Sequence, residues 1–344
     1  MTTFERIVIV APTIYTIRLD GYGGIERLVY LFAKGLLHHG VKPVIVASNG
    51  SRLPDGAVLF PTGEPIYDFQ EPLLLPTLRE CLRVVPGVGV VFDFSHSKPT
   101  HGYEFQTIIS PIWHDPYIMK PSVPRHNIAC LSQWQADRFE AVYYQDCRVL
   151  DPICADPEYF TPGDNKGDYC LFIGKLHPTK GCVQAIEACK SLKERLHIIG
   201  PVTPGDPEDY VKLVMGACDG EDIVYHGEVT EEGKRALIQG AKCLLYPVSY
   251  PPGTGESHSH KMVEAMMAGV PCIAYDQGAM SEVIEESVTG YVIRGRDQLK
   301  ESINACEELD RLKCRERAVE HWDYRRVVER WLEAAESVVK GQAW

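Results

Sequence analysis

The stretch GTGESHSHKMVEAMMAGVPCIAYDQG, residues 253–278, decides the fold class of this chain. It begins as a glycine-rich loop and continues as a run of helix-forming residues, 261–268, that ends at Gly269. The apolar run 270–275 that follows is typical of a buried parallel strand. The stretch therefore predicts a loop, a short helix and a strand of a parallel α/β sheet.

Two glutamates frame the beginning of this predicted helix. Glu256 lies on the loop and Glu264 on the helix, with seven residues between them. The first turn of a helix has unpaired backbone N–H groups and the positive end of the helix dipole, which suit a phosphate. Carboxylates accept hydrogen bonds from sugar hydroxyls. The pattern indicates a ligand with both phosphate and hydroxyl groups, although a plain turn and a solvated helix face would also explain it.

Length and composition limit the classes of protein that fit. A chain of 344 residues exceeds one ordinary core, so we expect two domains. The net charge of −12 argues against a nucleic-acid partner. No apolar run approaches the roughly 20 residues of a membrane span, and residues 1–6 show no signal-peptide pattern, so we expect a cytoplasmic protein. The twelve cysteines include no Cys-x-x-Cys pair, which favours buried free thiols over disulfides or zinc.

The first half of the chain alternates strands with helices. An apolar strand at 6–11 is followed by a long loop ending at Gly23 and Gly24, and by a helix from about 25 to Gly40. A dinucleotide-binding fingerprint fails here, because Glu26 stands where a third small residue is needed and the loop is too long. Further strands are expected at 43–47, 89–94, 107–113 and 127–132, and helices at 77–85 and 133–144, with no other pattern within the proline-rich segment 51–86.

Two histidines follow strands of this first half. His96 comes just after the strand 89–94, and His114 just after the strand 107–113. Ligands of open α/β sheets bind at the carboxyl ends of strands, so both side chains are candidates to line a ligand site. A lone histidine at a strand end can equally be a structural hydrogen-bonding group. We take His114 as the stronger candidate.

The second half repeats the alternation after a predicted linker at 151–168, which contains three prolines and two glycines. Strands are expected at 169–174, 196–200, 223–227, 243–246, 270–275 and 290–293. Helices are expected at 181–192, 207–217, 231–240, 261–268, 279–286 and 296–306, and the tail 308–339 is predicted to be helical. The pattern predicts two doubly wound domains in series.

A pair of lysines brackets the first strand-to-helix loop of the second half. Lys175 and Lys180 lie in FIGKLHPTKG, residues 172–181. Two cations at this place could stabilise the developing charge of a diphosphate leaving group. Isolated lysines on a loop are normally only solvated, so the signal lies in their order along the chain with Glu256 and Glu264.

Together these motifs resemble the retaining glycosyltransferases of family 4, which have the GT-B fold: two doubly wound Rossmann-like α/β domains facing across a cleft. The resemblance covers nearly the whole chain and rests on the segments 23–27, 114–115, 132–138, 156–162, 256–271, 278–282 and 288–292. It implies an N-terminal acceptor-side domain at 1–156, a C-terminal nucleotide-sugar-binding domain at 157–320, and a C-terminal helix within 321–344 that crosses back to the first domain.

The resemblance also implies roles for individual residues. The candidate catalytic residues are His114, Lys175, Lys180 and Glu256. The candidate donor-binding residues are Gly23, Gly24, Gly174, Gly200, Ser259, His260, Lys261 and Glu264. The two lysines and the backbone N–H groups of residues 259–261 would contact the donor diphosphate. The first glutamate would contact the transferred sugar and the second the ribose hydroxyls, while the histidine would line the sugar–acceptor side.

Two departures from the family pattern bear on these roles. Lys175 stands where the family usually has arginine, which keeps the charge but loses the bidentate fork. His258-Ser259 replaces the usual Phe-Gly, which leaves the identity of the sugar open. His258 and His260 have no third ligand in reach by sequence, so we expect neither a metal nor a cofactor.

The predicted function is metal-independent transfer of a sugar from a UDP- or GDP-linked donor to an acceptor hydroxyl, with retention of configuration. No residue is an evident nucleophile, so we expect same-face attack in which the leaving phosphate accepts the acceptor's proton. The alternatives are a phosphorylase or epimerase on the same fold, and a non-catalytic protein that binds sugar nucleotides. The first helix is only weakly basic, so the sequence favours a soluble acceptor over a membrane lipid.

Overall fold

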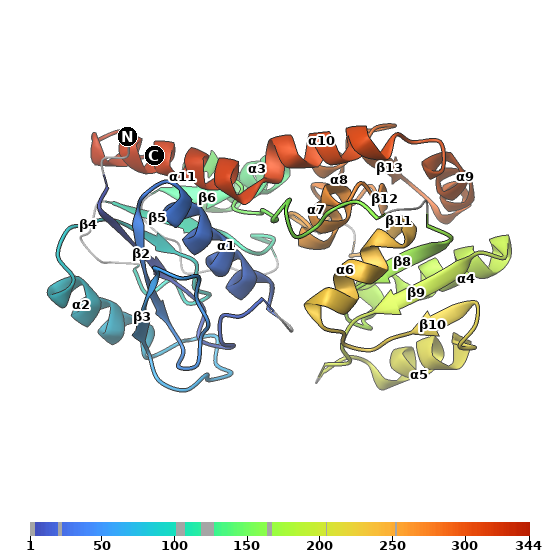
Figure 1. The fold of residues 1–344 in the computed structure, drawn as a ribbon, viewed down its shortest axis with the longest axis horizontal. Helices are drawn as coiled ribbons and strands as arrows, with labels where there is room; N and C mark the ends of the chain where they lie inside the picture. Colours follow the sequence, from blue (N-terminus) through green and yellow to red (C-terminus); the bar gives the residue numbers. More distant parts are fainter. Residues whose placement is uncertain are drawn as a thin grey trace. The chain divides into compact units, whose positions relative to one another are not determined.

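The computed structural model describes residues 4–19, 23–100, 107–117, 127–163, 167–203, 205–251 and 253–344, so residues 164–166 of the predicted linker lie outside the description. The chain forms two compact units, Met1–Cys154 with Asp323–Trp344 (unit 1) and Ala155–Trp322 (unit 2). Each unit contains one parallel sheet with helices packed on it (Figure 1). The predicted α/β class with two doubly wound domains is confirmed.

The sheet of unit 1 has the strand order β3-β2-β1-β4-β5-β6-β7, and every pair of neighbours is parallel. Its strands are β1 (Arg6–Val10), β2 (Lys42–Ala47), β3 (Val58–Pro61), β4 (Val88–Asp93), β5 (Ile108–Pro111), β6 (Ile128–Cys130) and β7 (Arg148–Val149). The chain starts at β1, winds outward through β2 and β3, and then resumes on the other side at β4. The direction of winding reverses between β1 and β4, where open sheets bind ligands.

The helices of unit 1 are α1 (Gly24–His38), α2 (Leu74–Val84), α3 (Gln133–Tyr143) and α11 (Tyr324–Val339). Leu78 and Cys81 of α2 pack on one sheet face, against side chains such as Val8 and Val10. Trp331 of α11 is fully buried and meets three phenylalanine rings edge-on at centroid distances of 5.1–5.4 Å, namely Phe32, Phe92 and Phe94. The last helix of the chain therefore completes the core of the unit that the first helix began (Figure 1).

Gly35 permits the close contact between α1 and α11. A Cβ at this position would lie 2.6 Å from Val328 Cγ2 and 3.1 Å from the carbonyl oxygen of Tyr324. We expect Gly35→Ala to lower the free energy of unfolding of unit 1 by about 1–3 kcal/mol, because the added methyl overpacks the contact. Urea unfolding followed by circular dichroism measures the loss.

The matched control is Gly216→Ala on α5 (Glu208–Ala217), where a Cβ would meet no atom within 4 Å. Alanine favours a helix interior over glycine by about 1 kcal/mol, so this variant should be at least as stable as the original chain. An unchanged unfolding midpoint in Gly35→Ala would contradict the tight contact.

The sheet of unit 2 has the order β10-β9-β8-β11-β12-β13, again with parallel neighbours. Its strands are β8 (Tyr169–Ile173), β9 (Arg195–Ile199), β10 (Ile223–Tyr225), β11 (Ala241–Tyr246), β12 (Cys272–Tyr275) and β13 (Gly290–Ile293). Its helices are η1 (Pro178–Lys180, a 3-10 turn), α4 (Cys182–Leu192), α5, α6 (Glu231–Gln239), α7 (His260–Met267), α8 (Met280–Val283), α9 (Arg296–Cys306) and α10 (Arg311–Trp322). The two units thus share one winding pattern, and the reversal in unit 2 lies between β8 and β11.

Some local elements differ from the sequence expectations. Helix α2 begins at Leu74, ahead of Pro76, because a proline in the first turn lacks only an N–H that the helix does not use. The tail is two helices, since the Asp323 carboxylate accepts the Arg325 N–H at 2.9 Å and caps α11. The strands β3 and β7, which the sequence did not predict, are short edge strands with exposed or half-buried residues.

All twelve cysteines are free thiols, and all except Cys147 and Cys218 are buried. The preference for buried thiols over disulfides is therefore confirmed. Within the described ranges, no helix is both long enough and apolar enough to cross a lipid bilayer.

Candidate active site

The candidate residues of unit 2 gather where its sheet reverses direction. Lys175 follows β8, Tyr246 ends β11, and Glu256 precedes α7, the helix that follows β11. The carboxyl ends of parallel strands meet at one edge of the sheet, and open α/β sheets bind ligands there. The topology therefore brings residues from distant parts of the sequence to one place.

Lys180 and Glu256 form an ion pair whose side chains are each 17% exposed. The Tyr250 hydroxyl accepts a hydrogen bond from Lys180 Nζ at 2.8 Å and donates to Glu256 Oε1 at 2.7 Å, and the Tyr246 hydroxyl donates to the same oxygen at 3.0 Å. Burial alone would lower the pKa of Lys180, but Tyr246, Glu256 and Tyr250 outweigh burial and hold this pKa well above its usual value. Burial would raise the pKa of Glu256, but Lys180 outweighs it and lowers this pKa. Both groups are therefore charged at neutral pH.

Two glycines fix the backbone next to Lys180 and Glu256. Gly181, directly after Lys180, has φ of +78°, and a Cβ there would overlap the carbonyl oxygen of Pro247. Gly278 has φ of +74°, and a Cβ there would overlap the backbone of Glu256, whose carbonyl oxygen also accepts the Ala279 N–H at 2.8 Å. Only glycine fits such positions without strain. The start of the segment 278–282 therefore packs directly against the backbone of Glu256.

Glu264 forms a second and more deeply buried pair with Lys234 of α6. Lys234 Nζ donates to both carboxylate oxygens, at 2.9 and 2.8 Å, and also lies 3.1 Å from Glu231 Oε2. The exposed fractions are 3% for Glu264 and 7% for both Lys234 and Glu231. Sequence reasoning missed Lys234, because a Glu-Lys pair three residues apart on a helix normally indicates only a solvated face.

Helix α7 begins at His260 with Ser259 as its N-cap, and the Ser259 side chain makes no capping hydrogen bond. The Ser259 N–H donates to Nδ1 of His258 at 2.7 Å. A diphosphate would have to displace this imidazole to reach the Ser259 N–H, whose expected role stays a prediction. The roles expected for the N–H groups of His260 and Lys261 stay predictions.

The remaining candidates of unit 2 lie at the ends of β8 and β9. The Gly174 N–H donates to the Ile199 carbonyl at 2.9 Å, and a Cβ at Gly200, where φ is +155°, would overlap the Gly174 carbonyl. Lys175 Nζ lies 3.9 Å from Asp206 Oδ1, with 35% of its side chain exposed. The two glycines are therefore adjacent, and Lys175 is more exposed than Lys180.

In unit 1, Gly23 and Gly24 begin α1. Gly23 has φ of +141°, and a Cβ there would lie 2.8 Å from Glu26 Oε2. Burial raises the pKa of the Glu26 carboxyl to about 7, with a smaller contribution from Glu71. Sequence reasoning used Glu26 only to reject a dinucleotide fingerprint, so this buried carboxyl beside the glycine loop was not predicted.

His114 lies just beyond β5 and is exposed. The Gln135 side-chain amide donates to the carbonyl oxygens of His114 and Ile112, at 3.0 and 2.9 Å. The His114 ring stacks on His96, with centroids 6.0 Å apart and planes 11° apart, and burial lowers the pKa of His96 to about 3. Both histidines predicted at strand ends are therefore adjacent, and His96 is neutral.

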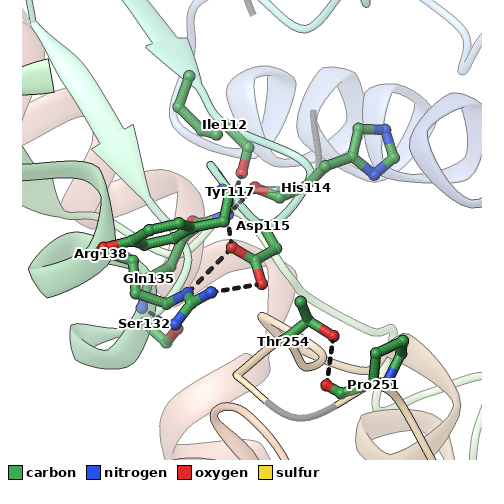
Figure 2. A network of polar contacts seen from close by, with 9 residues as sticks. All are labelled: Ile112, His114, Asp115, Tyr117, Ser132, Gln135, Arg138, Pro251 and Thr254. Carbon is green, nitrogen blue, oxygen red and sulfur yellow. Dashed lines mark hydrogen bonds and ion pairs between the residues drawn. The ribbon is translucent and has the colours of Figure 1, made fainter. Parts of the chain in front are cut away.

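A partly buried ion pair supports the loop that carries His114. Arg138 donates to both oxygens of Asp115, at 2.9 and 3.0 Å, and the Tyr117 N–H donates to Asp115 at 3.0 Å. Figure 2 shows the His114 side chain pointing away from this pair. Ser132 caps α3 by accepting the Gln135 N–H. The segment 132–138 thus acts as a scaffold for the strand ends.

Figure 2 also shows Pro251 and Thr254 of unit 2, which precede Glu256 in the sequence. The Thr254 hydroxyl and the Thr254 N–H both donate to the Pro251 carbonyl, at 2.8 and 3.0 Å. The sequence offered no signal for the partners Lys234 and Tyr250, whereas Tyr246 could have been found from its place at a strand end.

Over the described ranges, no group of three or more His, Cys, Asp or Glu side chains is arranged to hold a metal ion.

Comparisons with known proteins agree with this arrangement. Residues 160–321, nearly all of unit 2, match the family "Glycosyl transferases group 1". The chain is 28% identical over 223 residues to phosphatidyl-myo-inositol mannosyltransferase of Mycobacterium leprae. The aligned region covers 63% of this chain and 56% of that protein. The chain thus spans about half the length of the curated relatives it matches.

Solved structures share the whole fold. AviGT4, a glycosyltransferase involved in avilamycin A biosynthesis, superposes with a TM-score of 0.78 at 22% identity, covering 98% of this chain and 99% of that one. HepE from Anabaena, solved in complex with UDP-glucose, gives a TM-score of 0.68 at 13% identity, covering 96% and 99%. At these identities the likeness establishes the two-domain GT-B fold.

Proposed function

We propose that this chain, which has the GT-B fold and whose residues 160–321 match the group 1 glycosyltransferases, transfers a sugar from a UDP- or GDP-linked donor to an acceptor hydroxyl with retention of configuration. The observation that carries the proposal is the contact between Lys180 and Glu256. A cation for a phosphate and an acceptor for hydroxyl groups lie side by side, which fits a ligand whose phosphate and sugar are directly bonded. Glu264, on α7, suits the ribose hydroxyls.

The proposed reaction separates charge between the sugar and its leaving group. The bond from the anomeric carbon to the diphosphate oxygen breaks, and the acceptor oxygen bonds to that carbon on the same face. The acceptor's proton passes to the departing diphosphate oxygen. The Lys180 ammonium and the amino end of α7 stabilise the negative charge that develops there, and this role does not call for a divalent metal.

A thermal-shift panel of UDP-, GDP- and ADP-linked sugars tests the donor class. A ligand that binds the folded chain stabilises it by about 2.7 kcal/mol at 100 times its Kd, so the melting temperature should rise with the logarithm of concentration. We expect a rise with a UDP- or GDP-linked sugar and a smaller one with the matching nucleoside monophosphate. No rise with any sugar nucleotide would contradict the proposal.

Donor turnover, measured with and without an acceptor, tests the reaction type. We expect the free nucleoside diphosphate to be released faster when a hydroxyl acceptor is present, and NMR of the product should show the donor's anomeric configuration. A requirement for inorganic phosphate would indicate a phosphorylase instead, and an inverted product would contradict retention.

A further inference from the structure

Lys261, the second residue of α7, sends its side chain into the site. Its Nζ lies 5.6 Å from the centroid of the Tyr246 ring, at the end of β11. It would also lie 3.4 Å from a Cβ at Gly174, just beyond β8. The side chain is only partly exposed, and its ammonium therefore lies at the strand ends where the candidate residues gather.

The charged neighbours of Lys261 are already paired with one another. Lys180 pairs with Glu256, and Lys234 pairs with both Glu264 and Glu231. Within the described part of the chain, no carboxylate oxygen lies within 4.0 Å of Lys261 Nζ and no group accepts a hydrogen bond from it. A partly buried cation without a paired anion is costly, so its presence at a ligand site indicates an anionic ligand.

The balance of charge supports the same conclusion. The charges of Lys180 and Glu256 cancel, and Lys175 faces Asp206. Lys234 pairs with two glutamates, so these three side chains carry a net charge of about −1. Only a protonated Lys261 offsets that charge within this cluster, and without it the cluster would repel a diphosphate.

We propose that the Lys261 ammonium binds the diphosphate of the donor, next to the amino end of α7. This inference rests on the proposed function, because it takes the diphosphate of a sugar nucleotide as the ligand. It adds a side-chain contact to the backbone contact expected for the same residue. Lys261 is thus a positioning and affinity residue for the donor, separate from Lys180 at the leaving oxygen.

The protonation of Lys261 makes the inference measurable. Burial first, and then Lys180 and Lys234, lower the pKa of Lys261 to about 8, although Glu256 and Glu264 act in the opposite direction. A bound dianion favours the ammonium and raises this pKa. Above pH 8 the unbound chain has lost the proton, so binding must take one up, and affinity falls as the pH rises.

Few of the groups that face Lys261 titrate in the same range. The pKa of Lys180 is held well above its usual value, that of Tyr250 is raised to about 12, that of Tyr246 is raised, and that of Glu256 is lowered. The other facing groups are Glu264 from α7, Lys234 and Glu231 from α6, and Lys175 beyond β8. A change in affinity between pH 7 and pH 9 that disappears when Lys261 is replaced would therefore report on Lys261.

The test is calorimetric binding of UDP and GDP to the full-length chain at pH 7 and pH 9. For the original chain we expect affinity about tenfold lower at pH 9 than at pH 7, with proton uptake shown by heats in buffers of different ionisation enthalpy. Lys261→Met should bind about 10- to 100-fold more weakly at pH 7 and lose the pH dependence. Lys261→Arg should keep its affinity at both pH values, because a guanidinium stays protonated.

Two controls isolate the diphosphate contact. Lys300→Met removes an exposed lysine of α9 and should bind like the original chain. Uridine and guanosine, which have no phosphate, should bind the original chain and Lys261→Met equally. Equal UDP and GDP affinities and equal pH dependence in the original chain and Lys261→Met would overturn the inference. Failure of the original chain to bind either diphosphate would instead overturn the proposed function.

Discussion

Replacing Lys180 by alanine should reduce kcat for sugar transfer by about 10²-fold or more. The physical reason is that the Lys180 ammonium lies beside Glu256, the group proposed to hold the sugar, and so next to the bond that breaks. Removing one preorganised group that stabilises developing negative charge typically costs a factor of about 10²–10³ in kcat. Steady-state release of nucleoside diphosphate, at saturating donor and acceptor, measures the effect.

The ion pair itself offers a rival explanation, which a double variant separates. If Lys180 only neutralises Glu256, then Lys180→Ala with Glu256→Gln should recover much of the activity. If Lys180 acts on the leaving diphosphate, the double variant should be at least as slow as Lys180→Ala alone. Lys190→Ala, which removes an exposed lysine from α4, should turn over like the original chain. Full activity in Lys180→Ala would remove Lys180 from the mechanism.

Replacing Lys234 by methionine should lower the free energy of unfolding of unit 2 by about 3–5 kcal/mol. Lys234 is the cation between Glu231 and Glu264, and all three side chains are less than 10% exposed. Its loss leaves two buried carboxylates without their cation, and breaking a buried pair in this way costs about 3–5 kcal/mol. Differential scanning calorimetry should show a melting temperature lower by roughly 10 °C for a unit of this size.

The chain contains a matched control for this prediction. Lys242 also bridges two glutamates, Glu194 and Glu307, but their side chains are 22% and 51% exposed. Water can solvate these carboxylates when the lysine is removed, so Lys242→Met should cost only about 1 kcal/mol. Adding Glu264→Gln to Lys234→Met should recover part of the lost stability. Equal losses in Lys234→Met and Lys242→Met would contradict the argument from burial.

Much of the fold could be predicted because its central strands are continuous apolar runs. β1 and β8 lie within 6–11 and 169–174, the ranges expected for them, since both faces of each strand are covered by helices. The edge strands β3 and β7 lack this pattern, because solvent reaches their side chains. The break between α10 and α11 depends on one carboxylate cap, which periodicity does not show.

Some features of the candidate site could also be predicted from the sequence, and others could not. The spacing of Glu256 and Glu264 follows from local chain geometry at the amino end of α7, and the lysine–glycine order at residue 180 follows from that at the amino end of α4. Gly181 and Gly278 are required by backbone positions that no other residue fits. Such local requirements restrict the residue type at a position, so they can be recognised in the sequence.

The sequence alone therefore determined the two parallel sheets, the loop-to-helix unit and the identity of the glutamates and lysines around it. Only the tertiary structure decided which charges meet: Lys180 with Glu256, Lys234 with Glu264, and Lys261 with neither. The physical reason is distance along the chain. Alternating apolar runs specify strands locally, whereas a charged side chain finds its partner only when separate strands and helices pack together and exclude water from the contact.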